Sequence, residues 1–275
     1  MTNIGAIDLH KLRYFYLVVT LGSFSKAAAE LAVTQSAVSQ AITALEKTLG
    51  HPLLCRQKRS FSVTPLGTRL LSHAKKLFNL TQLMEKEINE ELSDSGSLAI
   101  GADELAINTL VPSLLESFLQ KQTKTEFHLT CRLPDDLLQL LSSGDLDLVF
   151  TYGLPQARQN TIVEKILQEE KLALMSAHKS NWHQLFVSKT FSHLLSELKL
   201  PQSTTIILEG TESSVAQLAR ISGGAALGPI SLARAYDLQV ERVLDRHSVT
   251  LRLLHHEENY CRPLMRRLIE EITFP

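Results

Sequence analysis

The sequence predicts an α/β protein in three parts: a small all-α domain with a hairpin, a long linker helix, and a C-terminal α/β domain of two lobes. Three observations in the 275 residues indicate this. Residues 8–50 hold apolar positions at helical spacing between turn residues. Residues 65–92 form one long helical pattern. From residue 98 onward, strand and helix patterns alternate, which is typical of a parallel sheet covered by helices.

Charge and hydropathy narrow the class of protein. Residues 1–80 carry ten basic and three acidic side chains, a net charge of +7, whereas residues 81–275 carry 18 and 26, a net charge of −8. This asymmetry predicts that the first part meets phosphate and the second does not. No run of 18 apolar residues occurs, so we expect no membrane-spanning helix and no membrane partner. The first eleven residues lack a basic stretch followed by an apolar one, which predicts a cytoplasmic location.

The first two predicted helices are short. Asp8 can cap the first helix, and Gly22 breaks the chain after it. Ser23 or Ser25 can cap an Ala-rich second helix over residues 27–31. The apolar face of the first helix consists of Leu12, Phe15 and Val19.

The third predicted helix has one apolar and one polar face. Thr34 can cap it, and Gly50 ends it. Its apolar stripe consists of Val38, Ile42, Leu45 and Leu49. Its opposite face presents Ser36, Ser39, Gln40, Thr43 and Lys47, with Gln35 at the helix start. Glutamine pairs with adenine in bidentate fashion, and serine reads several base edges, so this face suits the DNA major groove.

The second and third helices, joined by a tight turn at residues 32–33, predict a helix-turn-helix. The alternative for the polar face is a solvated surface of an ordinary helix. The basic charge around it favours DNA binding. Between residues 51 and 64, the basic side chains of Arg56, Lys58 and Arg59 surround apolar positions, which predicts a two-stranded wing that contacts phosphates.

A long helix is expected from Pro65 to Leu92, roughly 40 Å in length. Thr64 before Pro65 is a strong start signal. The spacing of its apolar or small positions alternates four and three, which predicts a seam that pairs with another helix. These positions are Leu70, Ala74, Leu77, Thr81, Met84 and Ile88. Because residues 93–97 form a Ser/Gly-rich break, we place the domains at 1–64, 65–93 and 97–275.

The C-terminal domain begins with a βαβαβ pattern, which predicts a parallel sheet. We expect strands at 98–102, 126–132 and 145–152, with helices at 105–120 and 134–143 between them. One face of the second strand would hold Phe127, Leu129 and Cys131. Later we expect strands at 161–175, 204–208 and 225–230 and helices at 213–221 and 258–272, whereas 178–200 fits no one element. We divide the lobes at 97–155 with 255–275, and at 156–254.

The N-terminal motifs occur in an order that is characteristic of one family. They are Gly22-Ser23-Phe24-Ser25, Ala27-Ala28, Leu31, the run from Val33 to Ile42, Leu45-Glu46, Leu49-Gly50, Leu53-Leu54, Arg56, Thr64 and Gly67. Over about sixty residues the chain resembles the LysR-type transcriptional regulators. It departs from them at Ser36, where the family usually has proline, and at Leu54, where it usually has phenylalanine.

The resemblance implies further roles. Gln35, Ser36 and Ser39 match the positions that approach bases, and Arg56 matches the wing arginine. The long helix would form a homodimer, and two dimers a homotetramer. With the residues beside them, the candidate DNA-binding set is Ser25, Lys26, Gln35, Ser36, Ser39, Gln40, Thr43, Arg56, Lys58 and Arg59.

The C-terminal part resembles the family's effector domain, which is built like a periplasmic binding protein with its small-molecule effector between two lobes. The matching segments are 98–101, 110–112, 144–148 and 223–229. After the first strand, Asp103-Glu104-Leu105 replaces the usual small or hydroxyl residues, and two acids there would oppose an anion. The alternative is that an acid only caps the following helix. The candidate effector residues are Asp103, Glu104, Thr151, Thr211 and Ser213.

Together these features predict a sequence-specific DNA-binding regulator under small-molecule control, with double-stranded DNA and RNA polymerase as partners. A C-terminal domain that serves only oligomerisation is the alternative. An enzyme with a DNA-binding appendix is disfavoured because no GxSxG, HExxH, CxxC or P-loop spacing occurs. The paired histidines at 178/183 and 255/256 lack further ligands at metal spacing, so we expect no metal and no cofactor.

Overall fold

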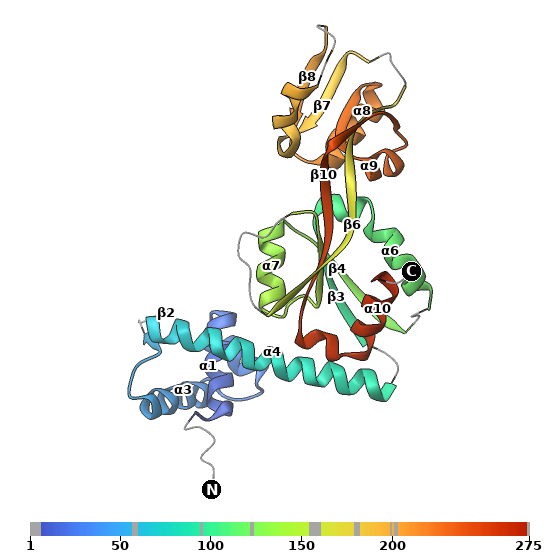
Figure 1. Cartoon of the computed structure of the whole chain (residues 1–275). Coiled ribbons are helices and arrows are strands. Elements are labelled where there is room, and N and C mark those ends of the chain that lie inside the picture. The colour runs from blue at the N-terminus through green and yellow to red at the C-terminus, as the bar shows by residue number, and fades with distance from the viewer. Residues whose placement is uncertain are drawn as a thin grey trace. The chain divides into compact units, whose positions relative to one another are not determined.

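The computed structural model describes most of the chain (Figure 1). The chain divides into two compact units, residues 1–84 and 85–275, and helix α4 (Pro65–Ser93) spans the division. The described residues are 7–56, 60–93, 96–121, 124–153, 161–178, 182–198, 200 and 203–273.

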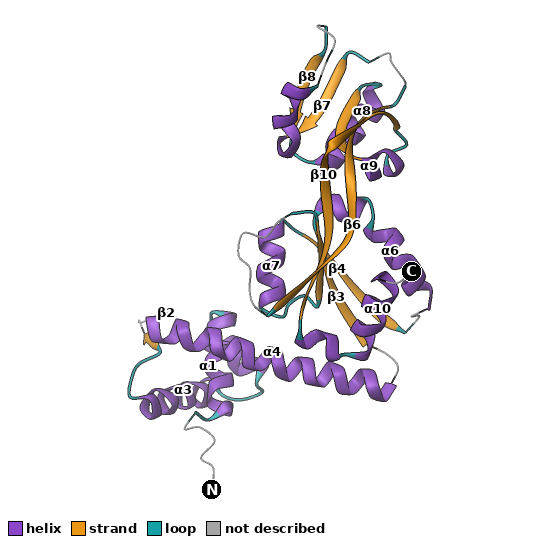
Figure 2. Cartoon of the chain, in the orientation of Figure 1, coloured by secondary structure: helices purple, strands orange, loops and turns teal. Residues whose placement is uncertain are grey.

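The first unit contains the three predicted helices and the predicted hairpin (Figure 2). Asp8 caps α1 by accepting hydrogen bonds from the amides of His10 and Lys11, and Ser23, rather than Ser25, caps α2. Gly22 ends α1 with a φ of 64°, a left-handed conformation that glycine adopts without strain. The elements are α1 (Leu9–Leu21), α2 (Phe24–Glu30), α3 (Gln35–Leu49), β1 (Leu54–Arg56) and β2 (Phe61–Val63).

The core of this unit confirms the stripe of α3 and corrects two other predictions. Val18 of α1 is buried where Val19 was expected, and Val19 packs beside it. Ala74 of α4 is buried in the same core, and Leu70 and Leu77 pack against it. The N-terminal half of the predicted seam of α4 therefore packs on the core of its own domain. The same apolar spacing suits packing on this core or on a second helix, so the sequence alone does not distinguish them.

The second unit is built on one sheet, and its eight described strands lie in the order β4-β3-β5-β10-β6-β9-β7-β8. The pairs β3–β4 and β3–β5 are parallel, as the βαβαβ pattern predicts. The strands are β3 (Gly96–Ala102), β4 (Thr125–Cys131), β5 (Leu148–Thr151), β6 (Ile162–Ser176), β7 (Gln184–Ser188), β8 (Thr205–Glu209), β9 (Ala225–Pro229) and β10 (Gln239–His256).

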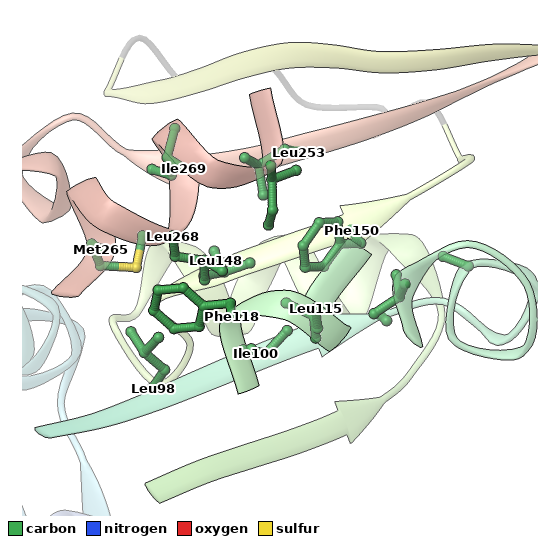
Figure 3. Packing of buried hydrophobic residues seen from close by; sticks show 14 of the residues in the cluster. Leu98, Ile100, Leu115, Phe118, Leu148, Phe150, Leu253, Met265, Leu268 and Ile269 are labelled. Carbon is green, nitrogen blue, oxygen red and sulfur yellow. The ribbon is translucent and has the colours of Figure 1, made fainter. Parts of the chain in front are cut away.

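Helices cover both faces of the sheet. Leu148 and Phe150 of β5 face α6 and α10 (Figure 3), whereas Val149 faces α7 on the opposite side. This alternation follows from the two-residue period of a strand. The helices are α5 (Glu104–Asn108), α6 (Val111–Lys121), α7 (Pro134–Ser142), α8 (Glu212–Ser222), α9 (Ile230–Ala235) and α10 (Pro263–Thr273), with 3-10 turns at Lys189–Glu197 and Glu258–Cys261.

Strands β6 and β10 form a long antiparallel pair in the middle of the strand order, and this pair joins the two halves of the sheet (Figure 1). One end contributes to the cores around β3 and β5, and the other to the cores around β7 and β9. The sequence pattern predicted β6 but not β10. The burial of β10 does not alternate regularly along the strand, so its period-2 signal is weak.

Three predicted elements differ in extent. The helix expected at 105–120 is two helices, because Pro112 cannot continue a helix begun at Glu104. The strand expected at 145–152 begins at Leu148, after a turn that contains Gly144 at φ 76°. The final helix begins at Pro263 after a 3-10 turn.

The structure also specifies strand β4 and the segment 178–200. Phe127 packs on the core, but Leu129 and Cys131 are exposed, because β4 is an edge strand that is only partly covered. The ambiguous segment contains β7 and a 3-10 turn. In the part of the chain that the structure describes, no helix is long and apolar enough to cross a membrane.

Candidate DNA-binding surface and effector site

Helix α3 is fixed at both ends. The hydroxyl of Thr34 accepts a hydrogen bond from the amide of Ala37 at 3.2 Å, and Gly50 ends the helix at φ 71°. Val38, Ile42 and Leu45 are buried on its inner face. The direction of its outer face is therefore set by the core and the caps together.

The outer face of α3 presents most of the predicted base-reading residues. Gln35, Ser36, Gln40 and Thr43 are exposed, and Ser39 is half-buried. The hydroxyl of Thr43 donates to the Ser39 carbonyl oxygen at 2.9 Å. The structure thus gathers these uncharged polar groups on one surface, with Ser39 less accessible than its neighbours.

The turn before α3 and the start of α2 complete this surface. Ala32 has a φ of 52°, unusual for a residue with a side chain, and its amide donates to the Ala29 carbonyl oxygen. Ser25 and Lys26 are exposed in the first turn of α2. The Ser25 hydroxyl donates to the Gln35 side-chain oxygen at 3.2 Å, so the beginnings of α2 and α3 are in contact.

The wing is tied to α3. The carboxylate of Glu46 accepts hydrogen bonds from the amides of Leu53 and Leu54, at 2.8 and 3.0 Å, where β1 begins. In the register of the hairpin, Arg56 pairs with Phe61. The predicted phosphate contacts Lys58 and Arg59, and the side chain of Arg56, lie outside the described residues.

Asp103, the first candidate effector residue, is 7% exposed. Its carboxylate accepts three hydrogen bonds. Its carboxylate caps α5 through the amide of Ala106 at 2.8 Å. It also accepts from the Thr151 hydroxyl at 2.7 Å and from the Tyr152 amide at 2.6 Å. Asp103 therefore caps α5, as the alternative expects, and its carboxylate also joins α5 to the end of β5.

Glu104 joins the other candidates. Its Oε1 accepts from the amide nitrogen of Asn108 at 3.3 Å and from the hydroxyl of Thr211, the cap of α8, at 3.4 Å. Asn108 also donates to the Ser213 hydroxyl at 3.3 Å. The other Glu104 oxygen, Oε2, is buried and has no hydrogen-bond partner among the described residues. Sequence reasoning missed Asn108, although its position four residues after Glu104 places both on one helix face.

The electrostatic environment here is negative. Burial raises the pKa of the Cys131 thiol, and the charges of Glu104 and Asp103 raise it further, against an opposing effect from Arg132. A negative field disfavours the thiolate. An anion placed here would experience the same repulsion.

A second buried acid lies near the first group. The Tyr152 hydroxyl donates to the carboxylate of Glu170, and the Ser231 amide donates to the same carboxylate at 2.9 Å. Burial, followed by the hydrogen bond and charge of Glu170, raises the pKa of Tyr152 well above its ordinary value. Tyr152 therefore stays a neutral donor.

Comparison with known families covers both units. The model of the bacterial regulatory helix-turn-helix proteins of the lysR family matches residues 9–68, and the model of the LysR substrate binding domain matches residues 92–273. This chain belongs to the LysR family.

Curated relatives of this LysR-family chain match about half of it. YybE of Bacillus subtilis, an HTH-type transcriptional regulator, is 35% identical over 52% of this chain and 49% of its own length. PecT of Dickeya dadantii is 31% identical over 53% of this chain and 46% of its own length. The chain thus spans about half the length of the curated relatives it matches.

Solved structures share the fold over nearly the whole chain. A full-length OxyR variant of Pseudomonas aeruginosa has a TM-score of 0.66 at 18% identity, over 98% of this chain and 95% of that one. LysG of Corynebacterium glutamicum, with bound effector Arg, has a TM-score of 0.60 at 19% identity, over 97% of each chain. CbnR complexed with its target DNA has a TM-score of 0.54 at 21% identity, over 97% of this chain and 98% of that one.

One cluster of charged residues was not predicted. The guanidinium of Arg262 is fully buried and donates to Glu90, to Asp147 at 2.6 Å and to the Ser97 carbonyl oxygen at 2.8 Å. Lys86 also pairs with Asp147, at 3.3 Å. The cluster attaches the last turns of α4 to the start of β3. Arg262 lies 172 residues after Glu90 in the sequence, so no local pattern predicts this cluster.

Among the described residues, no group of three or more His, Cys, Asp or Glu side chains is arranged to hold a metal ion. The three cysteines, Cys55, Cys131 and Cys261, are free and exposed.

Proposed function

We propose that this LysR-family chain regulates transcription by binding double-stranded DNA with sequence preference. The observation that carries the proposal is the outer face of α3, where uncharged polar side chains are exposed opposite a buried stripe. An uncharged surface lets a helix approach base edges, while basic side chains around it attract the phosphates.

Two sets of residues divide the work in this proposal. Readout of bases falls to Gln35, Ser36, Ser39, Gln40 and Thr43. Affinity for the DNA backbone falls to Lys26 at the start of α2 and to the wing residues Arg56, Lys58 and Arg59. Ser25, which precedes Lys26 in α2, completes the candidate set.

The test uses Gln35→Ala and Ser39→Ala in the full chain. Each good base contact contributes about 1–3 kcal/mol of discrimination, so each variant should bind a selected operator roughly tenfold more weakly or worse. Affinity for a scrambled duplex at the same salt should barely change, because neither residue is charged. Fluorescence anisotropy measures both, with circular dichroism as the folding control. An equal loss on both duplexes would remove α3 as the reader.

The effector component of the proposal places a small molecule beside Asp103, Glu104, Thr151, Thr211 and Ser213. Hydrogen bonds join these residues from β5, α5 and α8, and Glu104 Oε2 lacks a donor that a ligand could supply. The solved neighbour LysG, which carries its effector Arg, provides a precedent for a small molecule in this fold. Thermal shift against a metabolite library distinguishes this from a domain that serves only oligomerisation, which no small molecule would stabilise.

Assembly completes the proposal. Leu80, Met84, Ile88 and Leu92 leave exposed apolar side chains along α4, which suits a homodimer or a tetramer of two dimers. We place the protein in the cytoplasm, with RNA polymerase as a partner and with no enzymatic activity.

A further inference from the structure

The contact between Ser25 and Gln35 links two helices at the surface proposed to face DNA. Ser25 lies in the first turn of α2, and Gln35 is the first residue of α3. The Ser25 hydroxyl donates to Gln35 Oε1 at 3.2 Å. Both side chains are exposed, and within the described residues this is the one hydrogen bond that engages the Gln35 side chain.

This bond restricts where the glutamine amide lies. An amide presents two N–H donors at one end and an oxygen with two lone pairs at the other. With Ser25 on one lone pair, Gln35 keeps both donors and one lone pair for a ligand. If the amide turned over, the Ser25 hydroxyl would accept from Nε2 in place of donating to Oε1, so the contact holds the Gln35 side chain in place in either order of donor and acceptor.

That order matters for a base edge. Glutamine pairs with adenine by donating to N7 and accepting from the N6 amino group. The reversed amide would place donor against donor and acceptor against acceptor. A glutamine whose side chain is already restricted loses less rotamer freedom when it pairs, so its contact contributes more to the discrimination between bases.

The same bond limits what Ser25 can do by itself. A serine hydroxyl has one proton, and here Gln35 receives it. Phosphate oxygens only accept hydrogen bonds, so Ser25 cannot donate to a phosphate while the bond to Gln35 is intact. A direct phosphate contact and the observed geometry exclude each other.

We propose that Ser25 is a positioning residue that sets base specificity through Gln35 without touching a base. The inference rests on the proposed DNA-binding function and deepens it. The neighbouring hydroxyls show a related arrangement, since those of Thr34 and Ser36 share a hydrogen bond of 2.9 Å. The polar groups at the start of α3 are thus ordered before any DNA arrives.

The experiment is a double-mutant cycle in the full chain. An operator is first selected from a random duplex library with the unmodified protein, and the base pair that loses preference in Gln35→Ala is identified. Ser25→Ala should reduce discrimination at that same base pair by roughly tenfold, the range of one good base contact. The double variant should be no worse than Gln35→Ala alone, because Ser25 acts through Gln35.

Further variants separate positioning from contact. Ser25→Thr keeps the hydroxyl and should retain the preference. Thr48→Ala removes an exposed hydroxyl at the other end of α3, which bonds only to the Ala44 carbonyl oxygen, and should change nothing. The salt dependence of binding should be the same in Ser25→Ala as in the unmodified protein, because no phosphate contact is lost.

Three outcomes would overturn the inference. The first is a loss in Ser25→Ala that is equal on all duplexes and adds to that of Gln35→Ala, which indicates a direct backbone contact. The second is unchanged discrimination in Ser25→Ala while Gln35→Ala loses it, which leaves the proposed function intact. The third is unchanged discrimination in Gln35→Ala itself, which would show that the proposed reader is wrong as well.

Discussion

At the scale of single residues, His255 shows how burial converts a side chain into a pH-sensitive element. It is 2% exposed on β10, its Nδ1 lies 2.8 Å from the His256 carbonyl oxygen, and its ring stacks on Tyr260. Nε2 is buried and has no hydrogen-bond partner in the part of the chain that the structure describes. Burial lowers the pKa of His255, and the charges of Lys165 and His256 lower it further, against the bond to the His256 carbonyl.

The sign of the stability effect follows from this lowered pKa. As pH falls past the ordinary histidine value of about 6.5, the unfolded chain takes up the proton first, so acidification favours unfolding. The free energy of unfolding should therefore be unaffected by His255 at pH 7 and above, and it should fall as the pH drops below about 6.5. His255→Leu should therefore flatten the dependence of Tm on pH between pH 5 and 7, measured by calorimetry. A slope as steep as that of the unmodified protein would contradict this, and His51→Gln, at an exposed position, serves as the control.

At the scale of elements, α4 carries two apolar surfaces of different destination. Leu77 packs on the core of the first unit, whereas Met84 and Ile88 are 53% and 52% exposed. A charge at Leu77 would enter an apolar core, whereas a charge at Met84 or Ile88 would stay in solvent unless a second chain covered it. The seam that forms one pattern in the sequence therefore has one part packed inside the first unit and another part that is exposed and available for the proposed association.

We predict opposite results for the two parts of α4. Met84→Glu with Ile88→Glu should give a folded monomer at micromolar concentration, because dimerisation would bury unpaired charges. Sedimentation velocity measures the mass, and circular dichroism should show full helix content.

Leu77→Glu is the matched variant. It should lower the free energy of unfolding of the first unit by about 2 kcal/mol or more, because it places a charge against an apolar core. A double variant at Met84 and Ile88 that remains dimeric would mean that another surface carries association.

At the scale of the whole molecule, charge is segregated along the chain, and this sets the salt dependence of the proposed DNA binding. Lys58→Ala and Arg59→Ala should each reduce the slope of log affinity against log salt by about 0.9 if each removes one phosphate contact. Lys189→Ala, at an exposed position in the acidic part, should leave the slope unchanged. Anisotropy titrations at several salt concentrations measure the slopes. Equal slopes for all three variants would exclude the wing from the interface.

The ends of the helices and the division of α3 into a buried and an exposed face follow from the sequence alone. Thr34 and Gly50 mark the ends of α3, and its four-and-three spacing separates a buried from an exposed face. Capping depends on residues within one helical turn of each other, and amphipathic spacing depends on residues within two or three turns. Residues that are close in the sequence therefore determine both features. The same holds for the cap at Asp103 and for the helix that begins after Thr64.

Only the tertiary structure decided what covers each surface. The spacing in α4 places Leu77 on an apolar face. Whether its own domain or a second chain covers that face depends on how the chain folds back, and here Leu77 packs on the core of the first unit. The pairing of β10 with both β5 and β6, and the burial of Arg262 against Glu90 and Asp147, join segments that are far apart. A periodic pattern specifies which side chains are buried. The surface that they pack against depends on contacts between distant segments, which no local stretch of the sequence specifies.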